Sequence, residues 1–131
     1  MHDNFSILIV EDDIIICEDM KSSLKQLGFK RVDSVTSGEA ALEKVTREKP
    51  DLVMMDIVLR GQLNGIETSE ILKRDFDLSV IFLSAHTDPD TKKRTDAVQP
   101  YGYLSKPFHA LELKEAVEHA LQKHKEALKD S

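Results

Sequence analysis

Side chains that could do chemistry together follow the short apolar runs of this sequence. Each of them comes directly after such a run: Glu11, Asp12, Asp13, Asp56, Ser84 and Lys106. Carboxylates, a hydroxyl and an ammonium group are the equipment of phosphoryl transfer when they meet beside a divalent cation. The first question is therefore whether the fold brings these positions to one place.

A cluster of carboxylates needs a cationic partner. Two like charges about 4 Å apart repel by roughly 1 kcal/mol in water and by about 4 kcal/mol at an effective dielectric near 20. A hard cation removes that repulsion, and Mg²⁺ prefers a few carboxylates together with water. Phosphoryl transfer depends mostly on positioning and charge neutralisation, so no general base is required. In this interpretation Asp56 attacks phosphorus as the nucleophile.

Each of these residues alone has a simpler explanation. Acids favour helix N-termini, so Asp12 and Asp13 could both begin a helix. We assign that role to Asp13 and a metal-binding role to Asp12. Asp56 alone would be a strand-end acid, Ser84 a turn residue and Lys106 a surface lysine. The functional interpretation depends on all of them converging.

The elements that must position these residues alternate along the chain. Short apolar runs predict strands at residues 5–10, 31–35, 51–56, 78–84 and 101–105. Apolar residues at helical spacing predict helices at 13–28, 37–48, 64–76, 88–98 and 109–128. Thr36 and Glu39 are expected to form a capping box, and Leu128 is expected on the apolar stripe of the last helix.

Alternating strands and helices predict an α/β fold. Parallel strands joined by crossover helices are buried on both sides, which accounts for the unbroken apolar runs. We therefore expect a doubly wound, five-stranded parallel sheet with helices on both faces. Ligands of such sheets bind at the carboxyl ends of the strands, where the chemically active residues stand.

Composition limits the class of protein. The chain has 131 residues, 40% of them apolar and 32% charged, which fits one domain with one core. Its net charge of −6 argues against a general nucleic-acid binder. Cys17 is the single cysteine, so no internal disulfide can form. The N-terminal apolar run is too short for a signal peptide or a membrane span, and we expect a cytoplasmic protein.

Five short motifs together resemble the receiver domain of two-component response regulators. They are ILIVEDD, DLVMMDI, NGIE, FLSA and GYLSKPF, in the family's order and at matching intervals. The resemblance covers nearly the whole chain. We expect one receiver domain over residues 1–131, with a core at about 5–122 and a helical or frayed tail at 123–131. It implies a flavodoxin-like sheet with strand order 2-1-3-4-5. It also implies that Asp56 accepts a phosphoryl group from a phosphohistidine on a sensor kinase.

The resemblance also assigns residue roles. Asp12, Asp56 and the backbone carbonyl of Val58 would bind Mg²⁺ directly, and Glu11 would act near the ion through water. Lys106 would contact the phosphoryl oxygens, and its bond to Pro107 is expected to be cis. The remaining two roles are those of the switch: the hydroxyl of Ser84 and the aromatic ring of Tyr103.

Some positions depart from the family or keep two interpretations. Arg60 and Gly61 follow the acceptor where proline is often found, and Gln99 and Pro100 replace small residues before the last strand. These changes concern the signalling face rather than the site. Tyr103 is as readily a static strand aromatic as a mobile switch.

Side chains outside the motifs have ordinary interpretations. The basic run 92–94 reads as a solvated helix face, with docking of an acidic surface as the alternative. His109 reads as a helix cap and Cys17 as a core residue. His86 stands at the rim of the site. Val58 and His86 are best placed to admit or block hydrolytic water, and apolar Val58 predicts slow loss of the phosphoryl group.

Two other functions fit this sequence less well. An aspartate-nucleophile phosphatase would need a second Asp two residues after the nucleophile, and Val58 stands there. An unphosphorylated interaction domain would be expected to lack one of the acids or the lysine, and none is missing. We therefore expect a signalling phosphoacceptor that catalyses only its own phosphorylation and dephosphorylation.

The expected partners are a sensor histidine kinase or phosphotransfer protein and an unknown downstream protein. Direct nucleic-acid binding and membrane insertion are not expected. The kinase, the target and the oligomeric state are not encoded in any motif. The sequence leaves open whether the domain stands alone or was cut from a longer chain.

Overall fold

A computed structural model describes residues 2–84 and 88–130. Five parallel strands form one sheet: β1 His2–Val10, β2 Phe29–Val35, β3 Leu52–Asp56, β4 Val80–Ser84 and β5 Gly102–Ser105. Their order is β2-β1-β3-β4-β5, so the predicted doubly wound topology is confirmed. His86, expected at the rim of the site, lies outside the described residues.

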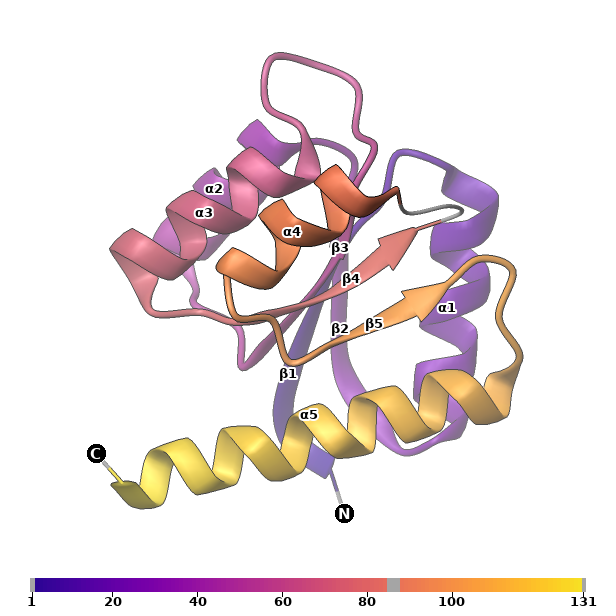
Figure 1. The fold of residues 1–131 in the computed structure, drawn as a ribbon. Helices are drawn as coiled ribbons and strands as arrows, with labels where there is room; N and C mark the ends of the chain where they lie inside the picture. Colours follow the sequence, from indigo (N-terminus) through magenta and orange to yellow (C-terminus); the bar gives the residue numbers. More distant parts are fainter. Residues whose placement is uncertain (1, 85–87, 131) are drawn as a thin grey trace.

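Helices cover both faces of the sheet (Figure 1). They are α1 Ile14–Gln26, α2 Gly38–Arg47, α3 Gly65–Phe76, α4 Pro89–Ala97 and α5 Ala110–Asp130. Helices α1 and α5 lie on one face, and α2, α3 and α4 lie on the other. This arrangement follows from right-handed crossovers on either side of a central strand.

The sheet divides the apolar core into two layers. On one face, Met20 and Leu24 of α1 and Val117 of α5 pack against inward residues of β1. On the other face, Val45 of α2 and Leu72 of α3 pack in a second cluster. All five residues of β3 are buried, as are all five of β4. The unbroken apolar runs of the sequence are thus explained by burial on both faces.

Helix caps confirm the sequence-based expectation at Asp13 and correct it at the start of α2. Asp13 caps α1 by accepting from the backbone N–H groups of Ile15 and Ile16, as expected. Asn64 caps α3 in a reciprocal capping box with Glu67. The predicted capping box of Thr36 and Glu39 is wrong, because Ser37 is the N-cap residue of α2 and accepts from Ala40.

Helix α5 is long and continues past the edge of the sheet (Figure 1). Leu113, Val117 and Ala120 are buried on its inner side. Leu128 was expected on the same stripe, but it is 62% exposed. The expectation was wrong for that residue because the last turns of α5 have no sheet beneath them.

Candidate functional site

Three chain segments, which follow or end β1, β3 and β5, bring acidic and basic side chains to one edge of the sheet. Glu11 and Asp12 directly follow β1, and Asp56 is the last residue of β3. Because β1 and β3 are paired and parallel, their carboxyl ends lie side by side. Lys106 directly follows β5 at the same edge.

Lys106 joins the two buried carboxylates. Its Nζ lies 2.5 Å from Oε1 of Glu11 and 3.2 Å from Oδ2 of Asp56. Glu11 is 1% exposed and Asp56 is 5% exposed. One ammonium group therefore faces two carboxylates that are almost fully removed from water, so the pocket carries a net negative charge when both acids are ionised.

The acidic residues could hold a metal ion. Carboxylate oxygens of Glu11, Asp12 and Asp56 all lie within 4.8 Å of one another. The donor set consists of oxygen atoms alone, which suits a hard cation such as Mg²⁺ rather than a metal that prefers nitrogen or sulfur. Three acids and a single lysine at this site also supply the negative charge that such a cation would neutralise. These residues fit the predicted ion.

Burial changes the acid–base properties of the pair. It raises the pKa of the Glu11 carboxyl to about 7, and the neighbouring Asp56 adds to the rise while Lys106 opposes it. Burial alone would lower the pKa of the Lys106 ammonium. Its hydrogen bond to Glu11 and the attraction of Asp56 outweigh that cost, so the pKa of Lys106 is raised. The lysine therefore stays charged.

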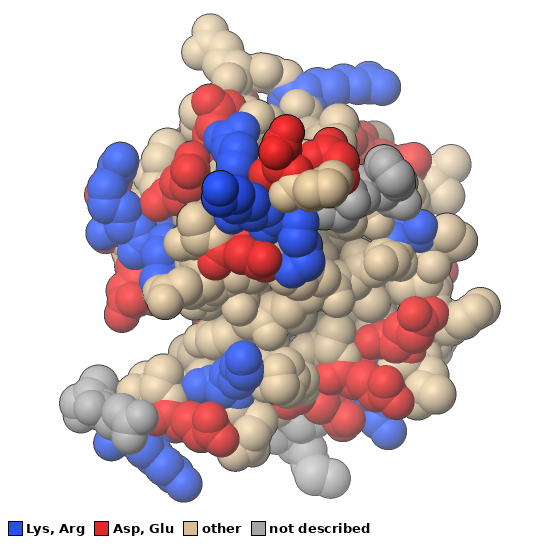
Figure 2. Space-filling model, in the orientation of Figure 1, with Lys and Arg blue, Asp and Glu red and all other residues tan. Residues whose placement is uncertain are grey.

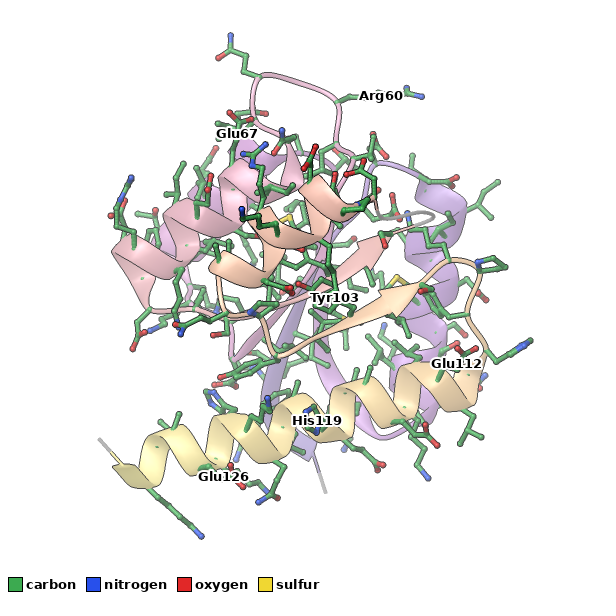
Figure 3. The ribbon with its side chains drawn as sticks, in the orientation of Figure 1. Arg60, Glu67, Tyr103, Glu112, His119 and Glu126 are labelled. Carbon is green, nitrogen blue, oxygen red and sulfur yellow. The ribbon has the colours of Figure 1, made fainter. Side chains whose placement is uncertain are left out.

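The segment between β3 and α3 closes one side of the site. The backbone N–H of Val58 donates to Oδ1 of Asp56 at 3.1 Å, and that of Arg60 donates to Oδ2 of Asp12 at 3.3 Å. The Arg60 side chain is 95% exposed, with Nε 3.7 Å from the same Asp12 oxygen. It extends from a loop that projects from the body of the molecule (Figure 3). The side chain of Val58 is 77% exposed at this rim.

The glycine of the NGIE motif has a steric role. A Cβ atom at Gly65 would overlap the backbone carbonyl of Asp56. The Gly65 N–H donates to the carbonyl of Ile57 at 3.0 Å. Helix α3 can therefore begin directly against the end of β3 only because this residue has no side chain.

Ser84 and Tyr103 border a shared hollow beside the acidic cluster. Ser84 is buried at the end of β4, and Tyr103 lies on the neighbouring strand β5. Both line a hollow of about 420 Å³, together with Asp88, Pro89, Lys92 and Ser105. The Tyr103 ring stacks on Phe82 with centroids 5.9 Å apart. The two predicted switch residues therefore face one space.

Comparison with known proteins decides the family. The family model of the response regulator receiver domain matches residues 7–118 of this chain. The chain belongs to the response regulator receiver family.

Relatives of this receiver domain are found among regulators and solved structures. The transcriptional regulatory protein YvrH of Bacillus subtilis is 32% identical over 111 residues, which are 85% of this chain and 46% of that protein. The solved signal receiver domain of a modulated diguanylate cyclase from Desulfovibrio desulfuricans is 34% identical. It has a TM-score of 0.84, and the match covers 92% of this chain and 95% of that one.

A second solved structure shares the fold equally well. The N-terminal domain of a response regulator/sensory box/GGDEF protein from Carboxydothermus hydrogenoformans is 35% identical, with a TM-score of 0.85. The match covers 94% of this chain and 98% of that domain. The receiver domain spans about half the length of the curated relatives it matches. Among the residues that the structure describes, no helix is long and apolar enough to cross a bilayer.

Sequence reasoning missed the contacts that hold Tyr103. Its hydroxyl donates to Asp96 and lies 2.9 Å from Oγ1 of Thr95, both on α4. Lys92 lies 4.1 Å from the ring centroid and 2.6 Å from Oδ1 of Asp96. The spacing of Lys92 and Asp96, four residues apart on a helix, could have indicated their pairing. No sequence signal places Tyr103 between them.

The basic run of α4 lies on the surface, as expected. Lys92, Lys93 and Arg94 are all exposed, and Arg94 lies 4.0 Å from Glu70 of α3. Figure 2 shows Lys and Arg side chains gathered over α4 with acidic side chains among them. Their charges are thus partly matched within this receiver domain.

The structure also describes other positions of this receiver domain. The peptide bond between Lys106 and Pro107 is cis. Cys17 is buried in the core. His109 precedes α5, and it is its backbone N–H, rather than its ring, that bonds to Glu112. His119 is exposed on α5.

A contact at the opposite edge of the sheet was also missed. Nε2 of His124 lies 3.4 Å from Oδ1 of Asp51, and its ring packs edge-on against Phe5. Asp51 in turn accepts from the backbone N–H of Ser6 at 2.8 Å. Because these residues are far apart in the chain, only the fold reveals the contact.

Proposed function

We propose that this receiver domain accepts a phosphoryl group on Asp56 in a Mg²⁺-dependent reaction. The donor is a phosphohistidine on a sensor histidine kinase or a phosphotransfer protein. The observation that carries the proposal is the position of Asp56. Its buried carboxylate lies 3.2 Å from the Lys106 ammonium and within 4.8 Å of carboxylate oxygens of Glu11 and Asp12.

Asp12, Asp56 and the backbone carbonyl of Val58 would hold the ion, and Glu11 would act near it through water. When bound, Mg²⁺ neutralises carboxylate charge and screens the charge of the incoming phosphoryl oxygens. The Val58 N–H and the Lys106 ammonium orient the Asp56 carboxylate from two sides. That orientation suits attack along a defined line.

In the transfer itself, a carboxylate oxygen of Asp56 forms a bond to phosphorus. The phosphorus–nitrogen bond of the donor breaks, and its electron pair remains on the imidazole of the donor histidine. Lys106 is placed to contact the transferred phosphoryl oxygens and to balance their charge. The chain thus needs only groups that position and neutralise.

The signal would leave the site through Ser84 and Tyr103. A phosphoryl group on Asp56 draws in the Ser84 hydroxyl, and Tyr103 then turns toward the hollow that both residues line. This movement requires release of the Tyr103 contacts to Thr95 and Asp96. The surface formed by α4, β5 and α5 would change and bind a downstream protein.

The remaining features fit a cytoplasmic signalling phosphoprotein. The domain would catalyse only its own phosphorylation and dephosphorylation. It would bind no nucleic acid directly and insert in no membrane. The exposed apolar side chain of Val58 offers no hydrogen bond to a hydrolytic water, which favours a long-lived phosphoryl group.

Intact-mass measurement with Mg²⁺ and acetyl phosphate tests the proposal. Wild-type protein should gain one acid-labile phosphoryl group, and Asp56→Asn should gain none. Asp33→Asn is the matched control, because Asp33 is a surface acid that pairs with Lys44 far from the site. Equal labelling of wild type and Asp56→Asn would refute the assignment of the acceptor.

A further inference from the structure

The loop between β3 and α3 is held by Glu39, a residue of α2. Glu39, the second residue of α2, accepts the backbone N–H of Leu63 at 2.7 Å through Oε1. We propose that Glu39 is a positioning residue for the metal-binding edge, acting through residues 57–64. This inference rests on the proposed Mg²⁺ site.

The carboxylate of Glu39 is available for this contact because it does not cap its own helix. Ser37 caps α2 instead, by accepting from the N–H of Ala40 at 3.1 Å. A hydrogen bond to an ionised acceptor is stronger than one between neutral groups. Glu39 therefore uses its charge on the neighbouring loop.

Gly61 gives independent support for the same contact. Its backbone has φ of 105°, a left-handed conformation that other residues rarely adopt. A Cβ atom there would lie 3.0 Å from Oε2 of Glu39. The loop thus wraps closely over the carboxylate, with one oxygen beneath Gly61 and the other bonded to Leu63.

The loop that Glu39 holds is tied to the site at its beginning. Val58 donates to the acceptor Asp56, and Arg60 donates to Asp12. Residues 60–62 are exposed and project from the body of the molecule (Figure 1). The contact at Leu63 fixes the far end of this projecting part, so it limits the positions that the Val58 carbonyl and the Arg60 amide can take.

Loss of the contact would reduce the fraction of molecules whose loop is in the binding conformation. The apparent dissociation constant of a ligand rises by the reciprocal of that fraction. For Glu39→Ala we expect Mg²⁺ affinity to fall about three- to ten-fold. Glu39→Gln keeps an acceptor oxygen and should restore part of the loss. Gly61→Ala should weaken Mg²⁺ binding as well, because it disturbs the same contact.

The test combines Mg²⁺ titration calorimetry with amide hydrogen exchange on the protein without divalent ions. Glu43→Ala is the matched control, because Glu43 is also exposed on α2 but pairs with Arg47. Glu39→Ala should speed exchange at Leu63 and weaken Mg²⁺ binding, whereas Glu43→Ala should do neither. A role in stability alone would lower the melting temperature without changing the Mg²⁺ affinity of the folded protein.

The outcomes separate this inference from the proposed function. Wild-type Mg²⁺ affinity in Glu39→Ala would overturn the inference and leave the proposed function intact. A wild-type protein that binds no Mg²⁺ would overturn both. Equal weakening by Glu39→Ala and Glu43→Ala would also overturn the inference, because the effect would then follow from lost surface charge.

Discussion

The receiver domain places a lysine between acceptor groups in two regions, one buried and one exposed. In the acidic pocket, Lys106 joins Glu11 and Asp56, which are almost fully buried. On the α4 surface, Lys92 joins Asp96 and the ring of Tyr103. The side chain of Lys106 is 17% exposed and that of Lys92 is 50% exposed.

This difference in burial changes what the charges do. In the pocket, burial and the second acid raise the pKa of Glu11 to about 7. On the surface, the hydrogen bond to Lys92 is the largest cause that lowers the pKa of Asp96. Water screens the surface pair, whereas the pocket retains an unbalanced negative charge. The buried acidic cluster could hold a metal ion, whereas the exposed charges of Lys92 and Asp96 hold the side chain of Tyr103.

Replacing each lysine with methionine should give the largest difference in stability between the two regions. Lys106→Met removes the only ammonium that contacts Glu11 and Asp56 among the described residues. Without divalent ions at pH 8, we expect it to lower the free energy of unfolding by about 3 kcal/mol. Urea denaturation of both variants measures this. A Lys92→Met effect as large as that of Lys106→Met would contradict the comparison.

The pH dependence of stability is the next largest expected effect. The pKa of Glu11 is raised from 4.5 to about 7 in the folded protein, so folding favours its protonated form. That stabilisation is complete below about pH 4.5 and is lost as the pH rises through about 7. Without divalent ions, stability relative to Glu11→Gln should therefore fall across this window.

Denaturation of both proteins at a series of pH values isolates this effect, because the other titrating groups are common to both. Parallel stability curves would show that Glu11 keeps an ordinary pKa. Repeating the series with Mg²⁺ should remove the difference if the ion favours the ionised carboxylate.

Tyr103→Phe tests the exposed region with a smaller change. It keeps the ring on Phe82 and beneath Lys92 but removes the hydroxyl that bonds to α4. We expect a loss of about 1 kcal/mol or less, because the freed acceptors can be hydrated. Amide exchange should increase in α4 but not at the acidic pocket. Tyr101→Phe serves as the control. If it increased amide exchange in α4 as much as Tyr103→Phe does, the effect could not be assigned to the Tyr103 hydroxyl.

The smallest effect is expected from Lys92→Gln. Exposed ion pairs contribute little and are screened by salt, so the melting temperature should move by about 2 °C or less. The change should shrink further when the ionic strength is raised to about 1 M, where the Debye length is about 3 Å. Thermal melts at two salt concentrations provide the measurement. A large or salt-independent change would show that Lys92 behaves like the buried Lys106.

Local patterns predicted the alternating strands and helices and the polar residues that follow the strands, whereas the strand order came from the family resemblance. The end of each strand, and the polar residue after it, can be recognised from the local sequence. Once the strand order is known, these ends can be placed at one edge of the sheet. Glu39 shows where this reasoning fails. A capping box with Thr36 is a local expectation, but the Leu63 amide, distant in sequence, takes the carboxylate instead. Tyr103 is another case, since its partners come from a different element.

Gly65 carries a mechanical consequence for the whole receiver domain. Since a Cβ there would overlap the carbonyl of Asp56, the first turn of α3 packs directly on the end of β3 with no side chain between them. Any backbone displacement at Asp56 must therefore displace the first turn of α3 as well. At Gly102, by contrast, a Cβ would meet nothing within 4 Å. In a library of variants, many residues should therefore be tolerated at Gly102 and almost none at Gly65. The constraint at Gly65 comes from the close packing of two backbone segments rather than from a chemical role of the residue.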